Sequence, residues 1–366
     1  MTTATKLKIA AISRINSPHH LDHLLPLCDL FQAPLVTCEE SDIGLIKTFY
    51  PSCQVQWVNS TKLHTEFIKE HYDIIIHSFS WPKKIIDFEL IPGKQTNRKK
   101  IRSLHIPHGN SDKGYASGVL GNYVYQDICL LYGDHMLDML RYHDILKDLK
   151  NTVIVGNLRL AYYQKYQPFF DAMAEKKIFS RLDPKKKTIL YAPTWDDYEK
   201  STSIFDVYPF VLEQIPREYN LIVKLHPWML RFESIGKVYH ILGKHEDIPN
   251  LVFISEYPPI YPLLAKADIY LGDFSSIGYD FLAFNRSMFF FNSSNRPSSD
   301  KSLFLHQCGT TISLQEGDQI LSLLEKGLRN DSHFASIRKN IYHYAFGPPC
   351  DLQKIKKEIL GLCQKS

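Results

Sequence analysis

The stretch GDFSSIGYDF, from Gly272 to Phe281, decides how this chain is expected to fold. The residues before it, AKADIYL, are typical of a helix end that runs into a short buried strand. The residues from Ile277 onward have apolar positions at helical spacing. A strand that leads at once into a helix is the repeating step of an α/β sheet. The stretch therefore predicts a strand-to-helix turn inside a sheet of that class.

Asp273, Ser275 and Ser276 lie at this expected turn. A helix start presents unpaired backbone N–H groups and a partial positive charge, which together suit an anion. The two serine hydroxyls add donors at the same place. The alternative interpretation is that one of the serines only caps the helix.

The same alternation of short apolar runs and amphipathic stretches extends over the whole chain. Runs of four to six apolar residues between helices indicate a mostly parallel sheet covered on both faces. We therefore predict an α/β protein of GT-B architecture, with two doubly wound Rossmann-like domains facing a central cleft. The expected strands lie within KIAAIS, PLVTC, VQWVN, DIIIHS, RSLHI, ICLLYG and TVIVGN, and then within TILYAPTW, LIVKLHP, LVFIS, DIYLGD and SMFFFN.

The crossing between the domains is expected where a helical stretch becomes strongly charged and ends in Asp-Pro and three lysines. This assigns residues 1–160 to an N-terminal Rossmann-like domain, 161–185 to a linker helix and 186–334 to a C-terminal Rossmann-like domain. The helices of 335–366 are expected to return to the first domain.

The composition is that of an ordinary globular protein, with 44% hydrophobic residues and a net charge of +4. Basic clusters at 93–102 and 183–187 are interpreted as solvated loops, with an anionic membrane surface or a polyanionic acceptor as the alternative. Nucleic acid is not an expected partner. Seven dispersed cysteines without a CxxC pair, and the lack of a signal peptide or an apolar run of bilayer length, favour the cytoplasm, with a peripheral place on the membrane left open.

Polar residues at the carboxyl ends of parallel strands are where open α/β sheets bind ligands. His108, Gly109 and Lys113 follow the expected strand RSLHI. Gly109 permits close approach of the backbone to a ligand, and a histidine such as His108 titrates near neutral pH, as a general base requires. The alternative for His108 is an ordinary exposed loop histidine.

The second half of the chain carries further such residues. Thr194 ends a strand, and its hydroxyl is placed to reach a phosphate. Lys224 and His226 fall on one side of their strand and suit a pyrophosphate, although a salt-bridged lysine and a hydrogen-bonded histidine explain them equally well. Asp280 lies one turn into the helix after the serine pair, and Arg286 follows that helix, placed to bind a phosphate or to pair with Asp280.

Several classes of chemistry lack their sequence signals. Asp196 and Asp197 are interpreted as loop carboxylates, because no convergent set of ligands for a hard cation accompanies them. The chain has no GxSxG elbow, no GxxxxGK[ST] phosphate loop and no GxGxxG fingerprint. We therefore expect no metal and no cofactor.

Five motifs in order resemble those of the CDP-glycerol glycerophosphotransferases, the teichoic-acid primase and polymerase family. They are PHGNSDK, VGNLRLAYY, LYAPTWDD, VKLHP and GDFSSIGYDF, within residues 104–292. The resemblance implies a GT-B fold and transfer of glycerol phosphate from CDP-glycerol, the donor substrate, to a hydroxyl of a cell-envelope acceptor, with release of CMP. The acceptor implied is a lipid-linked or polymeric glycan.

By this resemblance, His108 aligns with the family's candidate catalytic base and His226 with a second essential histidine near the donor phosphates. The donor would be held by Thr194, Lys224, Ser275 and Ser276, whereas Asp273 and Asp280 match motif carboxylates of structural or binding role. Gly109, Lys113 and Arg286 complete the expected donor site.

The motifs also depart from the family pattern. Pro107 stands where an aromatic residue is common, and Phe274 replaces a tyrosine. The alternatives are therefore a sugar-nucleotide glycosyltransferase, which releases a nucleoside diphosphate, a nucleotide-sugar epimerase, or a non-catalytic scaffold of the same fold.

Overall fold

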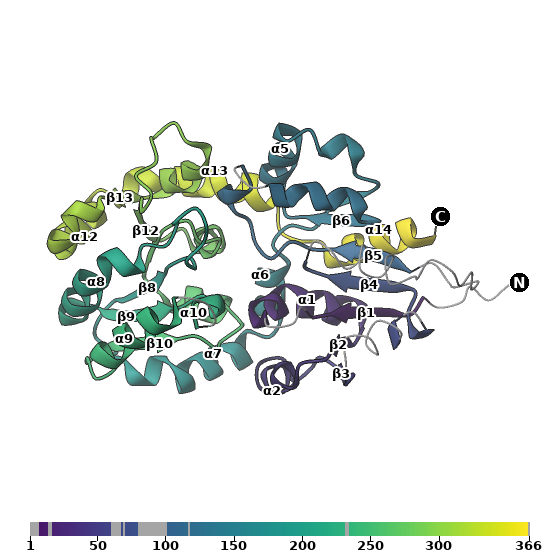
Figure 1. Cartoon of the computed structure of the whole chain (residues 1–366), viewed down its shortest axis with the longest axis horizontal. Coiled ribbons are helices and arrows are strands. Elements are labelled where there is room, and N and C mark those ends of the chain that lie inside the picture. The colour runs from purple at the N-terminus through teal and green to yellow at the C-terminus, as the bar shows by residue number, and fades with distance from the viewer. Residues whose placement is uncertain are drawn as a thin grey trace, which may run out of the picture. The chain divides into compact units, whose positions relative to one another are not determined.

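The computed structural model describes residues 7–13, 17–59, 67–68, 70–79, 101–115, 118–230 and 234–364. The chain divides into two compact units, each built around one parallel sheet (Figure 1). The first unit comprises Met1–Gly109, Ser117–Tyr162 and Ala345–Ser366, and the second comprises Asn110–Ala116 and Tyr163–Tyr344. Most of the basic cluster at 93–102 lies outside the described residues.

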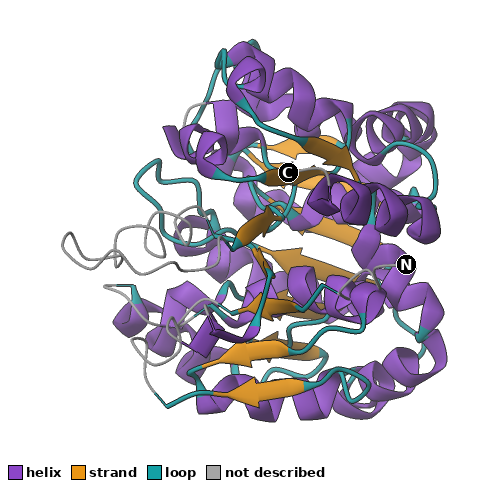
Figure 2. Cartoon of the chain, turned by 90° about the vertical axis from the view of Figure 1, so that its right-hand side faces the viewer, coloured by secondary structure: helices purple, strands orange, loops and turns teal. Residues whose placement is uncertain are grey.

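The sheet of the first unit has seven parallel strands within the described residues, in the order β3-β2-β1-β4-β5-β6-β7. Figure 2 shows the stacked strands with helices on both sides. The alternating apolar runs explain this arrangement, since strands such as β4 are buried along their whole length. The strands are β1 (Ile9–Ile12), β2 (Leu35–Thr37), β3 (Val55–Trp57), β4 (Ile74–His77), β5 (Arg102–His105), β6 (Ile128–Leu131) and β7 (Thr152–Ile154).

The helices of the first unit follow these strands in the manner of a doubly wound sheet. The α-helices whose bounds fall within the described residues are α1 (Leu21–Phe31), α2 (Glu40–Phe49), α5 (Asp134–Tyr142), the start of α6 (Leu158–Lys165) and α14 (Leu352–Gln364). Ala10, Val36 and Ile75, from three neighbouring strands, are among the residues of one core cluster. No helix among the described residues is long and apolar enough to cross a bilayer.

The second unit repeats the plan with six parallel strands within its described residues, in the order β10-β9-β8-β11-β12-β13. The strands are β8 (Thr188–Ala192), β9 (Asn220–Lys224), β10 (Leu251–Ile254), β11 (Ile269–Gly272), β12 (Ser287–Phe291) and β13 (Thr310–Ile312). The helices are α7 (Gln167–Lys177), α8 (Ile204–Glu218), α9 (Ile235–His245), α10 (Tyr261–Lys266), α11 (Ile277–Phe281), α12 (Ile320–Arg329) and most of α13 (Ala335–Phe346).

Helix α8 shows why these elements pack as they do. Val207, Val211 and Ile215 recur at a spacing of four residues and are fully buried in the core cluster against the second sheet. The predicted strands are confirmed. The structure adds β13, for which the sequence interpretation gave no strand. Thr310–Ile312 has three residues at the sheet edge and gives little periodicity to detect.

Both sheets have the strand order of the dinucleotide-binding fold, in which the first strand of the sheet lies beside the fourth. The direction of winding therefore reverses between β1 and β4 in the first unit and between β8 and β11 in the second. Ligands of open α/β sheets bind beyond the carboxyl ends of the strands at this reversal. Thr194 and Asp273 follow β8 and β11, so the second unit has polar residues at that point.

The division of the chain differs in detail from the expected domain bounds. The expected linker, 161–185, belongs to the second unit from Tyr163 onward, and the return to the first unit comes at Ala345, inside α13. Residues Asn110–Ala116 belong to the second unit, although residues of the first unit precede and follow them. We call this segment the strap.

Candidate active site

Asp273 ties together the loops at the strand reversal of the second sheet. Its Oδ1 accepts a hydrogen bond from the Thr194 backbone N–H at 2.9 Å. Its Oδ2 accepts from the backbone N–H and the hydroxyl of Ser203, both at 2.9 Å. The carboxylate is fully buried. Asp273 therefore fixes the segment between β8 and α8 to the end of β11, which is a positioning role.

Burial raises the pKa of Asp273 to about 6, against the hydrogen bonds from Thr194 and Ser203 and the charge of Lys113, which lower it. The loops it joins are separated by 79 residues in the sequence. Replacing this carboxylate would release both loops at once.

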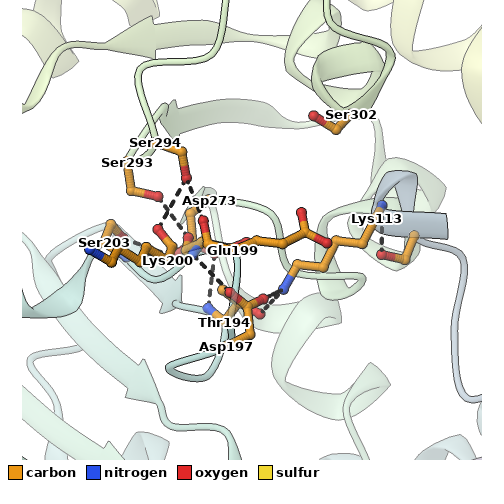
Figure 3. Close-up of polar contacts among 12 residues, drawn as sticks. Lys113, Thr194, Asp197, Glu199, Lys200, Ser203, Asp273, Ser293, Ser294 and Ser302 are labelled. Atoms are coloured by element: carbon orange, nitrogen blue, oxygen red, sulfur yellow. Dashed lines mark hydrogen bonds and ion pairs between the residues drawn. The ribbon is translucent and has the colours of Figure 1, made fainter. Parts of the chain in front are cut away.

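Lys113 enters this site from the strap. Its Nζ donates to Thr194 Oγ1 at 2.8 Å and forms an ion pair with Asp197 Oδ2 at 2.5 Å (Figure 3). Its own backbone N–H is held by Ser111 Oγ at 3.3 Å. The structure thus brings together Lys113 and Thr194, two of the residues predicted from separate motifs.

The strap is anchored on both sides of Lys113. Asp112 accepts a hydrogen bond of 2.6 Å from Tyr279 Oη and one of 3.0 Å from the Leu305 backbone N–H. Asp112 and Tyr279 are both buried. The Lys301 ammonium lies over the Tyr115 ring at 5.5 Å from its centroid. These contacts set the position of Lys113 in the second unit.

A small recess lies beside these residues. Charged, hydroxyl and aromatic groups share its wall, which suits a polar ligand with an anionic group. The lining residues of the recess are Ser111, Asp112, Lys113, Asp273, Phe274, Ser275, Tyr279, Ser302, Leu305 and His306.

The two serines of the organising stretch differ in position. Ser275 lines the recess. Ser276 precedes α11 as its N-cap residue, but its side chain makes no capping hydrogen bond. Ser276 therefore does not act as a side-chain cap, and Ser275 is the serine of the pair that lines the recess.

Asp280 and Arg286 make structural contacts. Asp280 is buried and accepts a hydrogen bond of 3.0 Å from Tyr261 Oη. Arg286 donates through Nη1 to the carbonyls of Ala265 and Ala267, at 2.8 and 2.6 Å, at the end of α10. The last carbonyls of a helix lack intrahelical partners, so an arginine there stabilises the helix end. These contacts favour a structural role over the expected donor-binding one.

Lys224 and His226 lie at the end of β9 and are not among the residues that line the recess. Lys224 Nζ donates to the carbonyls of Leu225 and Ser255, both at 3.4 Å. His226 Nδ1 accepts from the Trp228 backbone N–H at 3.2 Å, and its ring centroid lies 6.3 Å from that of Trp195. Because Nδ1 accepts this hydrogen bond, it carries no proton, and the N–H of the imidazole is on Nε2.

The first unit places His108 in an exposed position just after β5. Its ring stacks on that of His20, with centroids 4.5 Å apart and planes 19° apart. His20 is buried and its Nδ1 lies 2.5 Å from Ser78 Oγ, beyond the end of β4. Gly109 has φ +125°, which favours glycine at the point where the chain passes into the strap.

Most of the residues that line the recess were not among the predicted site residues. Ser302 and His306 are two of them, and Arg296, also not predicted, donates to Ser302 Oγ at 2.7 Å. For Arg296 a signal was available, because it lies in the polar run NSSNRPSSD that begins at the end of the strand SMFFFN. Among the residues that the structure describes, no group of three or more His, Cys, Asp or Glu side chains could hold a metal ion.

Comparison with known proteins first identifies the class of fold. The wall teichoic acid polymerase TagF superposes with a TM-score of 0.65 over 98% of this chain and 88% of that chain, at 13% identity. The UDP-GlcNAc 2-epimerase of Neisseria meningitidis, bound to UDP-GlcNAc, gives 0.63 over 98% and 100%, also at 13% identity. The two doubly wound units therefore define a GT-B fold.

Sequence comparison then gives a family match over part of the chain. Residues 166–307 match the model of the CDP-glycerol:poly(glycerophosphate) glycerophosphotransferases. The teichoic acid glycerol-phosphate primase of Bacillus subtilis (strain 168) is 34% identical over 119 residues, which is 32% of this chain and 29% of the primase. The chain thus matches less than a third of the length of that relative. The matched residues 166–307 include most of the residues that line the recess, so the likeness to this family covers that part of the chain.

Proposed function

We propose that this protein transfers glycerol phosphate from CDP-glycerol to a hydroxyl of a cell-envelope glycan or glycolipid and releases CMP. The single observation that carries the proposal is the meeting of Lys113, Thr194 and Ser275 at the strand reversal of the second sheet. These residues come from three motifs of the family. A lysine ammonium and two hydroxyls are the groups that bind a diphosphate.

In the proposed reaction the donor diphosphate occupies the recess, and Lys113 neutralises charge on it. The acceptor hydroxyl oxygen forms a bond to the phosphorus that carries glycerol. The bond from that phosphorus to the bridging oxygen breaks, and CMP leaves with the electron pair. The acceptor proton passes to His108, which we propose as the general base. Such transfer depends on positioning and electrostatics and requires no covalent intermediate on the protein.

His226 is the second histidine that the family resemblance implies near the donor. Its Nε2 is proposed to donate to the leaving phosphate, because Nδ1 already accepts from the Trp228 backbone. Lys224, with Nζ on two carbonyl oxygens, is proposed to act with it. Asp273 acts by holding the Thr194 loop in place.

The test is calorimetric titration of the purified protein with CDP-glycerol, CMP and their uridine counterparts. We expect cytidine-selective binding that Ser275→Ala weakens and that Ser276→Ala changes less, because only Ser275 lines the recess. Production of CMP from CDP-glycerol with a glycan acceptor would establish the transfer itself.

Other results would redirect the assignment. A preference for uridine nucleotides, with release of a nucleoside diphosphate, would indicate a glycosyltransferase. Lack of binding to every nucleotide, with acceptor present as well as absent, would indicate a non-catalytic scaffold of this fold.

A further inference from the structure

Two cations at the recess are each held by a carboxylate from the same loop. Lys113 Nζ pairs with Asp197 Oδ2 at 2.5 Å, and Arg296 Nη2 pairs with Glu199 Oε2 at 2.7 Å. Asp197 and Glu199 both lie in residues 195–200, which follow β8 and which we call the counter-ion loop. Figure 3 shows both carboxylate residues in the same polar cluster as Lys113 and Asp273.

Arg296 stands at the rim of the recess. Its guanidinium carbon lies 4.4 Å from the centroid of the Phe274 ring, and its Nη1 donates to Ser302 Oγ at 2.7 Å. Phe274 and Ser302 both line the recess. The stacked ring and the hydroxyl orient the guanidinium plane, as bidentate recognition of a phosphoryl group requires.

Glu199, the ion-pair partner of Arg296, is the group that a ligand could replace. The Glu199 side chain is 31% exposed, whereas that of Arg296 is 12% exposed. A partly exposed ion pair contributes little to stability because solvent screens it and ordering two long side chains is costly. The diphosphate as a whole carries more negative charge than a single carboxylate and offers more acceptor oxygens to the guanidinium.

We propose that Arg296 binds a phosphoryl group of the diphosphate ligand, and that Glu199 is the internal counter-ion which this group displaces. The inference rests on the proposed function and extends it to a residue outside the predicted site. Arg296 keeps its stacking on Phe274 when Glu199 leaves, so the guanidinium is already oriented for the ligand.

The backbone of the counter-ion loop is held independently of the ion pair. Ser294 Oγ donates to the carbonyls of Glu199 and Lys200 at 3.2 and 3.1 Å, and Ser293 Oγ donates to the carbonyl of Ser201 at 2.7 Å. Glu199→Gln preserves these contacts and the side-chain shape while it removes the competing charge. The variant therefore separates competition from folding.

The experiment titrates pyrophosphate and CDP-glycerol separately into the wild type, Glu199→Gln, Arg296→Gln and Arg296→Lys. Glu175→Gln is the matched control, because Glu175 pairs with Lys266 at 2.5 Å in the same unit, outside the residues that line the recess. We expect Glu199→Gln to bind both ligands about 2- to 5-fold more tightly, the scale of one exposed ion pair. Arg296→Gln should bind both at least about 10-fold more weakly, and Arg296→Lys should lie between, since lysine cannot bind bidentately.

Unchanged or weaker binding by Glu199→Gln, with Glu175→Gln like the wild type, would overturn the inference. A gain in affinity cannot arise from damage to the fold, and thermal melting of each variant checks its integrity. If CDP-glycerol binds with cytidine selectivity but equally to all variants, the inference fails and the proposed function stands. If pyrophosphate binding follows Arg296 and Glu199 as expected but no nucleotide binds, the inference stands and the proposed function fails.

Discussion

The hydroxyl of Tyr279 donates a 2.6 Å hydrogen bond to Asp112, a residue 167 positions earlier in the chain. Asp112 belongs to the strap, and Tyr279 lies in α11, directly after the serine pair. With the bond from the Leu305 N–H, both oxygens of the buried carboxylate are used to hold the strap. Lys113 is the next residue, so this contact determines where the Lys113 ammonium lies in the recess.

Replacing Asp112 with alanine should loosen the strap and leave the Tyr279 hydroxyl and the Leu305 N–H without this acceptor. We expect the free energy of unfolding to fall by about 1–3 kcal/mol, the cost of buried polar groups that lose their partner. Affinity for CDP-glycerol should fall as well, because Lys113 is no longer fixed. Chemical denaturation and calorimetry measure the two effects, and Tyr279→Phe, which removes one hydroxyl, should give a smaller change in each. Equal stability of wild type and Asp112→Ala would contradict the anchoring role.

Replacing Lys113 with glutamine removes the cation and retains much of the side-chain volume. A hydrogen bond to a charged group contributes roughly 1.5–3 kcal/mol, so donor affinity should fall about 10- to 100-fold. Lys185→Gln, at an exposed lysine of the same unit, serves as the control. Calorimetric titration measures the affinity of both variants for CDP-glycerol. An equal loss of affinity in both would indicate a general effect of net charge and would contradict a specific role of Lys113.

The histidine predicted as the base is tested by His108→Ala. A general base contributes about 10²- to 10⁴-fold to the rate, so turnover should fall by that factor while donor affinity stays unchanged. His71→Ala removes another exposed imidazole of the first unit as the control. Turnover is measured as CMP release from CDP-glycerol, and near-normal turnover of His108→Ala would rule out the proposed role.

Stability should depend on pH through the buried His306. Its ring stacks on Phe290 with centroids 4.7 Å apart, and burial lowers its pKa from 6.5 to about 4. The unfolded chain therefore takes up this proton below about pH 6.5, whereas the folded unit resists it until about pH 4. The free energy of unfolding should fall over this window as the pH falls, by up to roughly 3 kcal/mol from this residue.

His306→Phe retains the aromatic stack and should reduce that loss on acidification, whereas His240→Asn, at an exposed histidine, should not. Asp273 acts in the opposite direction, because its raised pKa means that the folded state binds the proton more readily below about pH 6. Asp273 is present in both variants, so the comparison isolates His306. Denaturation curves between pH 4 and 7 provide the measurement, and identical slopes for His306→Phe and wild type would refute the prediction.

The sequence by itself determined the fold class and indicated the strand ends as candidate places for a ligand. The apolar runs and helical periodicities are local signals, and within the described residues they located each strand except the short Thr310–Ile312. The rule that polar residues at strand ends face ligands selected Thr194 and Ser275, which the structure places at one strand reversal. It missed Arg296, although that residue follows a predicted strand at a distance of only five positions.

The tertiary structure alone decided what each side chain contacts. Asp280 and Arg286 lie in the right part of the sequence, yet they bond to Tyr261 and to the end of α10. Lys113 follows the fifth strand of the first unit in the sequence, yet it belongs to the second unit, where it contacts Thr194. The side-chain partners Asp280 and Tyr261 are separated by 19 residues, and Lys113 and Thr194 by 81. Local propensity carries no information about which distant groups meet, because that depends on how distant segments pack within a unit.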